Sequence, residues 1–203
     1  MVEGKTVYNF SAGPCVLPKE VLKRAQAEIL DWHGSGLSVM EMSHRGKYFC
    51  EIAETAKSNL KKLLKIPEEY TIFFLQGGAS QQFSAICQNL LGEDATHKAA
   101  NYLTTGTWSE SAVAEAKKYC DATEIANNKG NKYAFISEPA EWKIKEDATF
   151  FHYCDNETIQ GFEFHDFPHN IVPKGQLMVC DMSSNFCSKP IDWEKYDVVY
   201  AGA

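Results

Sequence analysis

The sequence has few arginines and no long apolar segment. Only Arg24 and Arg45 occur among its 20 basic residues, and the formal net charge is -7 at pH 7. This acidic balance argues against nucleic acid as the main partner, because clusters of Lys and Arg bind phosphate backbones. No apolar run approaches the ~20 residues that a membrane-spanning helix needs, so we expect no membrane partner. With so little arginine, Arg45 is the leading candidate for a planar clamp on an anion.

Several common signatures are also missing. The N-terminus has no apolar signal core, so we expect a cytoplasmic protein. The seven cysteines are odd in number and show no C-x-x-C spacing, and we interpret most of them as reduced core residues. No Walker loop and no G-x-G-x-x-G fingerprint occurs. The histidines, His97 among them, show no ligand spacing, so we predict no metal site.

The apolar residues that are present follow helical and strand periods in alternation. Residues 1–17 carry turn-forming Gly and Pro, which predicts an N-terminal arm. Helical periods predict four helices, at residues 18–32, 47–64, 80–91 and 108–119. Compact apolar runs predict strands at residues 71–75, 99–103, 123–126, 149–153, 177–180 and 198–200.

This alternation predicts an α/β fold with a largely parallel sheet that is covered on both faces. After the arm, residues 18–203 are expected to form one large domain, because a chain of 203 residues can build one sizeable core. The polar segment at residues 129–146 is interpreted as an excursion over the surface.

Two candidate sites lie between a predicted strand and a predicted helix, at the strand ends where open α/β sheets bind ligands. Residues 76–80 (Gln-Gly-Gly-Ala-Ser) lead into a helix whose first amides would bind an anion such as phosphate. A tight turn without a ligand is the alternative. Residues 104–109 occupy the same kind of position. There, Trp108 either stacks on a flat ring or packs against the start of its helix.

Three further segments carry polar residues. Thr158, after the strand at 149–153, either donates to a polar ring atom or is an ordinary loop residue. Asp181 ends a buried strand, where an unpaired charge is costly. It therefore pairs with a cation such as a pyridinium N–H, or it caps the amides of the serines that follow. His44 and Arg45 suit a carboxylate or small dianion, although an exposed Arg near a helix start is unremarkable by itself.

Seven short segments occur together in one order over nearly the whole chain. They are residues 9–14, 41–45, 74–78, 105–109, 156–158, 180–186 and 200–203. In this combination the sequence resembles the phosphoserine aminotransferases, class V members of the fold-type-I pyridoxal 5'-phosphate enzymes. The resemblance implies the large cofactor-binding domain of that fold, with a mostly parallel mixed sheet covered by helices. The second, smaller domain of the family is absent from this sequence.

The resemblance implies a role for each matching residue near the cofactor. Ala79 and Ser80 would bind the phosphate of pyridoxal 5'-phosphate through the loop and the helix start. Trp108 would stack on the pyridine ring, and Thr158 would contact its polar edge. Asp181 would pair with the ring nitrogen, so Asp181 and Trp108 would be the catalytic residues of this segment.

The implied substrates are small molecules. Arg45, helped by His44 and the loop at Ser11, would hold a substrate carboxylate or phosphate. The implied reaction is reversible amino transfer from L-glutamate to 3-phosphohydroxypyruvate, which gives 2-oxoglutarate and O-phospho-L-serine in serine biosynthesis. A homodimer is likewise implied by the family and by nothing in the composition.

The sequence departs from the family at its end. In the family a Gln-Lys pair follows Tyr-Ala-Gly-Ala at once, and that lysine carries the cofactor, whereas here Ala203 is the last residue. Neither Lys189 nor Lys195 matches that position. We expect this chain to be the first part of a longer protein, with the lysine just after Ala203. A true truncation is the alternative, and it would be catalytically incompetent.

Three other functions stay open at this stage. Another enzyme of the same fold, such as a desulfurase or a transaminase with different substrates, is one, and a site of the serine-glyoxylate type would lack the His44 and Arg45 pair. A non-catalytic module would keep the cofactor pocket without the lysine. A nucleotide-binding α/β domain is weakened by the missing dinucleotide fingerprint.

Overall fold

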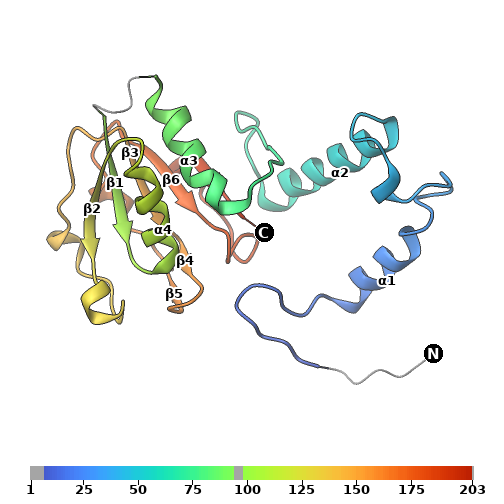
Figure 1. Cartoon of the computed structure of the whole chain (residues 1–203), viewed down its shortest axis with the longest axis horizontal. Helices are drawn as coiled ribbons and strands as arrows, with labels where there is room; N and C mark the ends of the chain where they lie inside the picture. The colour runs from blue at the N-terminus through green and yellow to red at the C-terminus, as the bar shows by residue number, and fades with distance from the viewer. Residues whose placement is uncertain (1–6, 94–97, 203) are drawn as a thin grey trace. The chain divides into compact units, whose positions relative to one another are not determined.

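The computed structural model describes residues 7–93 and 98–202, which divide into two compact units with a boundary between Ile72 and Phe73 (Figure 1). His97 and Ala203, which the sequence analysis considered, lie outside the described residues. Each unit is described separately below.

The described residues of the first unit form two α-helices and a short 3-10 helix (Val39–Glu41). Helix α1 (Lys19–Glu28) starts after Pro18, as predicted, but ends four residues before the predicted end at 32. Gly34 and Gly36 follow it with φ of 80° and 74°, a backbone conformation that glycine adopts without steric cost. Helix α2 (Lys47–Leu64) has the predicted bounds. It ends because Lys65 turns left-handed and its N–H bonds back to the carbonyl of Lys61.

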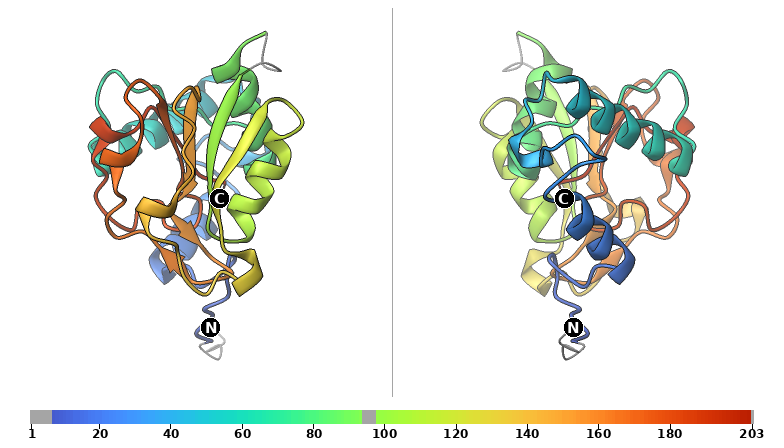
Figure 2. Two further views of the ribbon diagram at one scale, coloured as in Figure 1. Left: turned by 90° about the vertical axis from the view of Figure 1, so that its left-hand side faces the viewer. Right: turned by 90° about the vertical axis from the view of Figure 1, so that its right-hand side faces the viewer.

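The second unit is built on a five-stranded sheet in the order β2-β1-β3-β6-β7 (Figures 1 and 2). Every ladder in this sheet is parallel, which confirms the predicted α/β fold. The strands are β1 (Ala99–Thr104), β2 (Asp121–Asn127), β3 (Phe150–Cys154), β6 (Leu177–Asp181) and β7 (Val198–Tyr200). Strands β1, β3 and β6 are buried almost throughout, because both faces of a parallel sheet are covered, whereas β2 at the sheet edge is partly exposed. A short antiparallel pair follows β3, formed by β4 (Asn156–Glu157) and β5 (Phe162–Glu163).

Two helices cover one face of this sheet. Helices α3 (Gly78–Leu91) and α4 (Thr107–Ala116) pack their apolar sides onto the inner residues of β1 and β3 (Figure 2). On the other face, turns and irregular segments replace helices as the cover. Trp142 lies in the segment predicted as a surface excursion, yet its indole is buried against Phe151 and Phe167. The segment at residues 129–146 therefore contributes to the apolar core on the sheet face opposite α3 and α4.

The predicted strand at residues 71–75 is wrong. The structure has no strand there, and the side chains of Phe73, Phe74 and Leu75 are 57–70% exposed. A strand requires a neighbour for its backbone N–H and C=O groups. No segment among the described residues pairs with this one, so its apolar, strand-prone composition does not decide its structure.

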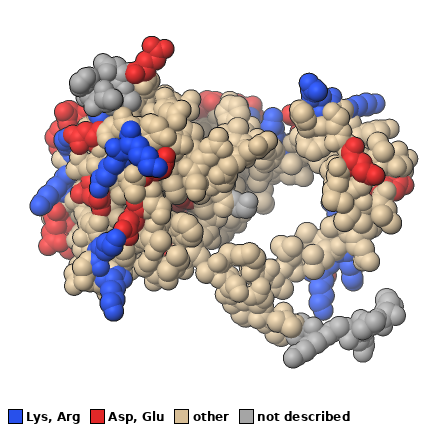
Figure 3. All heavy atoms as spheres, viewed as in Figure 1, with Lys and Arg blue, Asp and Glu red and all other residues tan. Residues whose placement is uncertain are grey.

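The surface of the second unit carries charges of both signs. Lys side chains (blue) are interleaved with Asp and Glu (red) in Figure 3, and four lysines of this unit form ion pairs across α4, β2 and the adjoining segments. All seven cysteines are free thiols, but only part of the core interpretation holds, because Cys15, Cys50 and Cys187 are exposed. In the parts of the chain that the structure describes, no helix is long and apolar enough to cross a membrane.

Candidate functional site

Three predicted site segments meet at the carboxyl ends of β1, β3 and β6. Strand β1 lies between β2 and β3 in the sheet. The chain therefore passes from β1 to β2 on one side, and then returns across β1 to form β3 on the other side. Such a reversal is where open α/β sheets bind ligands. Trp108 follows β1, Thr158 follows the β3 end, and Asp181 is the last residue of β6. The sheet topology thus explains why residues far apart in sequence share one edge.

Asp181 is buried, with 5% of its surface exposed. Its Oδ1 accepts hydrogen bonds from the backbone N–H of Ser183 at 2.8 Å and from the Ser183 hydroxyl at 2.6 Å. The capping role predicted as one alternative is therefore present. The register of the parallel ladders sets Asp181 beside Tyr200, and burial, reinforced by that carboxylate, raises the pKa of the tyrosine well above its ordinary value.

The start of α3 is open to an anion. Gly77 and Gly78 have φ of 89° and 58°, so the chain turns sharply into the helix. No side chain caps this helix, and the N–H groups of residues 78–80 have no acceptor among the described residues. Such amides, at the positive end of a helix, are suited to bind a phosphate. Of the two alternatives predicted for residues 76–80, this geometry favours the phosphate site.

Gly202 joins the α3 start to the turn that holds Asp181. The N–H of Gly202 donates to the Ser183 hydroxyl oxygen at 2.9 Å. A β-carbon on Gly202 would lie 2.8 Å from the amide nitrogen of Ala79, which is too close for any other residue without a shift. A helix start with free amides and a buried carboxylate therefore lie in one connected cluster.

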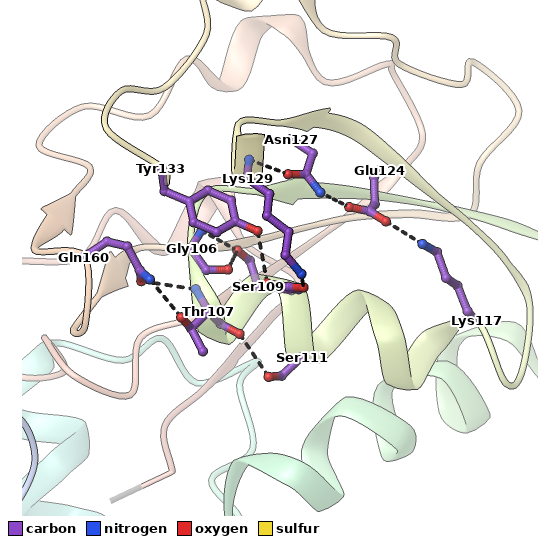
Figure 4. Close-up of polar contacts among 11 residues, drawn as sticks. Gly106, Thr107, Ser109, Ser111, Lys117, Glu124, Asn127, Lys129, Tyr133 and Gln160 are labelled. Atoms are coloured by element: carbon purple, nitrogen blue, oxygen red, sulfur yellow. Dashed lines mark hydrogen bonds and ion pairs between the residues drawn. The ribbon is translucent and has the colours of Figure 1, made fainter. Parts of the chain in front are cut away.

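The start of α4 is closed by the segment that follows β3. Gln160 Oε1 accepts from the N–H of Thr107 at 3.1 Å, and Gln160 Nε2 donates to the Thr107 hydroxyl at 2.8 Å (Figure 4). The two carboxylate oxygens of Glu157 accept from the N–H groups of Trp108 and Ser109, each at 2.9 Å. Three of the amides that a helix start leaves unpaired are thus satisfied by residues about fifty positions later in the chain.

The sequence analysis missed Glu157. Only 1% of its surface is exposed, and burial raises the pKa of its carboxyl group, although the donors at Ser109 and Trp108 act in the opposite direction. One sequence signal could have pointed to it. Gly106 stands at the N-cap of α4 and offers no side chain, so the cap had to come from elsewhere in the chain.

The remaining predicted residues differ in their surroundings. Trp108 keeps 40% of its surface exposed, so its indole is available to a ligand. Thr158 is half-buried in the turn after β4. Ser11, His44 and Arg45 lie in the first unit, where all three are exposed. The structure brings the predicted residues of the second unit together at one edge of the sheet.

Two lysines near the end of the chain are engaged in ion pairs. The ammonium group of Lys189 lies 2.7 Å from Asp155 and 3.3 Å from Glu163, and it donates to a backbone carbonyl at 2.6 Å. Lys195 pairs with Asp192 at 3.4 Å. Both ammonium groups are thus held by carboxylates of the chain itself. No group of possible metal ligands occurs within the described ranges.

Solved structures of two phosphoserine aminotransferases share this architecture. The pyridoxal phosphate-bound enzyme from Trichomonas vaginalis has a TM-score of 0.87 at 46% sequence identity, and the alignment covers 97% of this chain and 53% of that one. The enzyme from Bacillus circulans subsp. alkalophilus has a TM-score of 0.88 at 40% identity, with coverage of 98% and 53%.

Curated relatives and a family model agree with the structural likeness. Phosphoserine aminotransferase 1, chloroplastic, of Arabidopsis thaliana is 51% identical over 197 residues, which is 97% of this chain and 44% of that protein. The phosphoserine aminotransferase of Nitrosomonas europaea is 48% identical over 98% of this chain and 54% of its own length. The chain thus spans about half the length of these relatives. Residues 7–203 match the family model described as Aminotransferase class-V. With nearly the whole chain matched, the chain belongs to the aminotransferase class-V family.

Proposed function

We propose that a full-length protein carrying this chain is a pyridoxal phosphate-dependent phosphoserine transaminase. It would transfer an amino group reversibly between L-glutamate and 3-phosphohydroxypyruvate, with 2-oxoglutarate and O-phospho-L-serine as the products, in serine biosynthesis. One observation carries this proposal: the open start of α3 and the buried carboxylate of Asp181 are joined through Ser183 and Gly202. The names of the relatives support the choice of substrates.

The residues of this cluster fit pyridoxal 5'-phosphate. The free amides at Ala79 and Ser80 would bind its phosphate. Asp181 would accept a hydrogen bond from the ring nitrogen, since a buried carboxylate favours a cationic partner. The exposed part of the Trp108 indole would lie against the ring face, and the Thr158 hydroxyl would contact a polar ring substituent.

The bound cofactor supplies an electron sink for negative charge at the substrate α-carbon. Asp181 would hold the proton on the ring nitrogen and so keep that nitrogen cationic. Trp108 would exclude water from one face of the ring and fix its orientation. The lysine that carries the cofactor is proposed to follow Ala203, in agreement with the ion pairs that occupy Lys189 and Lys195.

Reduction with borohydride followed by intact-mass analysis tests the proposal on the full-length protein. We expect one reduced pyridoxal phosphate adduct per chain, and we expect O-phospho-L-serine to form from glutamate and 3-phosphohydroxypyruvate. Reversible cofactor binding without reaction with glutamate would instead indicate a non-catalytic module. Turnover with a different substrate pair alone would indicate another enzyme of this fold.

Arg45 is proposed to bind a substrate anion, together with His44 and Ser11. The other arginine of the chain, Arg24, is exposed on α1 and pairs with Glu28, so it provides a matched control. We expect Arg45→Ala to raise the KM for glutamate about tenfold or more, whereas Arg24→Ala changes it by less than about twofold. Unaltered glutamate turnover in Arg45→Ala would show that the assigned substrate role is wrong.

Assembly and location complete the proposal. We propose a homodimer in the cytoplasm, with small-molecule substrates and no nucleic acid partner. Light scattering of the purified full-length protein measures its oligomeric state, and fractionation of the source cells measures its location. The names of the two Arabidopsis thaliana relatives include the word chloroplastic, so a plastid fraction would be the informative contrary result for location.

A further inference from the structure

The α4 start depends on a carboxylate from a distant segment. Glu157 accepts three hydrogen bonds there: from the amides of Trp108 and Ser109 at 2.9 Å, and from the Ser109 hydroxyl at 2.5 Å. All three donors approach a side chain that is almost fully buried. A buried carboxylate is costly unless donors of this kind surround it. It also lies at the positive end of the helix, where a negative charge is favoured.

The backbone is shaped for this contact. A β-carbon on Gly106 would lie 2.5 Å from the carboxyl carbon of Glu157 and 2.6 Å from Gln160 Oε1. The φ of Gly106 is -177°, which any residue can adopt, so close approach to these side chains is the reason for glycine here. The absence of a side chain at Gly106 therefore lets the Glu157 carboxylate reach the backbone of α4.

The contact connects two predicted ligand residues. Glu157 holds the backbone of Trp108, and it is itself the residue before Thr158 in the chain. On its other side, Asn156 donates to the Ser184 hydroxyl at 2.6 Å, and the N–H of Asp155 donates to the carbonyl of Asp181 at 2.8 Å. The ends of β1, β3 and β6 are thus fastened to one another at this edge of the sheet.

We propose that Glu157 is a positioning residue for pyridoxal phosphate. It fixes Trp108 and Thr158 relative to each other, so that both side chains contact the same cofactor ring. The inference rests on the proposed function, because it assigns these two residues to the cofactor. It goes further in naming the group that orients them. Glu157 touches neither the cofactor nor the substrate in this assignment, and it acts only through the start of α4 and the turn after β4.

Glu157→Gln in the full-length protein tests the inference. Glutamine keeps the length of the side chain, but its NH₂ group would face an N–H donor at α4, so at least one of the three bonds is lost. Glu110→Gln is the matched control. It also removes a carboxylate from the first turn of α4, but one that faces Lys129 and Tyr133 at the surface.

Two readouts separate positioning from simple helix stability. The first is the Kd for pyridoxal phosphate, obtained by titration of the cofactor-free protein. The second is the visible circular dichroism of the bound cofactor at saturation, which reports the orientation of the ring in its chiral surroundings. We expect Glu157→Gln to raise the Kd about tenfold and to change the dichroism band even at saturation, whereas Glu110→Gln stays within about twofold with an unchanged band.

An unchanged Kd and band in Glu157→Gln would overturn the inference, even if the cofactor-free variant melts at a lower temperature. If that variant does not fold, Ser109→Ala decides, because it leaves Glu157 in place and removes one of its three donors, together with the acceptor of the Thr105 and Gly106 amides. We expect about a two- to fivefold weaker Kd and a smaller change of the band, and no change in either would overturn the inference. A wild-type protein that binds no pyridoxal phosphate would refute the proposed function and this inference together. If the wild type binds pyridoxal phosphate and both Glu157→Gln and Ser109→Ala keep its dichroism band and its Kd, the inference is refuted and the proposed function is not.

Discussion

Replacement of Lys189 by Met should destabilise the protein without detaching the cofactor. The carboxylate of Asp155 is 4% exposed, and its ion pair with Lys189 measures 2.7 Å. Burial disfavours the charged ammonium, yet the carboxylates of Asp155 and Glu163 raise the pKa of Lys189 overall, so the ammonium group is charged at neutral pH. Met fills a similar volume but leaves Asp155 with the Asn185 amide at 2.6 Å as its main donor.

The size of the effect follows from the burial of each partner. Breaking a fully buried ion pair by removing one partner costs about 3–5 kcal/mol. The Lys189 side chain is 32% exposed, so water can reach the vacated position and replace part of the lost interaction. We therefore expect a loss of about 2–3 kcal/mol in the free energy of unfolding. The lost bond from Lys189 to the carbonyl of Phe164 acts in the same direction.

Lys195→Met is the matched control, because that lysine pairs with Asp192 at 3.4 Å and both side chains are about half exposed. Such a surface pair contributes about 0–1 kcal/mol. Urea unfolding of both full-length variants measures the difference, and borohydride reduction with intact mass shows whether the cofactor stays attached. Equal losses in the two variants would refute the argument from burial. Loss of the adduct in Lys189→Met alone would refute the assignment of the cofactor to a different lysine.

Two further predictions concern packing and pH. Gly106→Ala forces a β-carbon against the Glu157 carboxyl group and should cost about 1–3 kcal/mol in urea unfolding. Gly130→Ala meets no atom within 4 Å and should change stability by less than about 1 kcal/mol. Burial lowers the pKa of His152 to about 3, so the histidine is neutral when folded and takes up a proton on unfolding at acidic pH. Its contribution is present above the ordinary pKa of about 6.5 and is lost as the pH falls toward 3, by up to ~1.4 kcal/mol per pH unit. His152→Phe should therefore lose less free energy of unfolding between pH 6.5 and 4.5 than the wild type loses. An equal loss would show that the pKa of His152 is not lowered in the folded protein.

The sequence predicted those parts of the fold that depend on local patterns. Residues 47–64 carry a long helical period with a stop before Pro67, and α2 has the predicted bounds. The runs at 99–103 and 149–153 are apolar because their strands are buried on both faces, and both were found. Residues 71–75 carry the same local signal, but a strand also needs a partner, which local composition does not reveal.

The same distinction applies to the site. Asp181 stands out in the sequence as an acid at the end of an apolar run, and the structure confirms that it is buried at the end of a strand, whereas its role toward a cofactor stays a prediction. Glu157 was missed because its three donors lie 48 or 49 residues earlier in the chain. In the sequence it appears as one polar residue in a loop. Its importance becomes visible only when the parallel sheet brings the ends of β1 and β3 together.

The two helix starts of the second unit explain which of them suits a phosphate. Both α3 and α4 begin after a glycine that offers no side chain as a cap, so neither helix start can be capped by the residue before it. At α4, Glu157 and Gln160 occupy the free amides, and a ligand anion would compete with a carboxylate already in place. At α3 the amides of residues 78–80 remain without an acceptor among the described residues. The distribution of caps, more than the number of glycines, therefore favours α3 for the phosphate. It leaves α4 to present the Trp108 indole from a firmly held backbone.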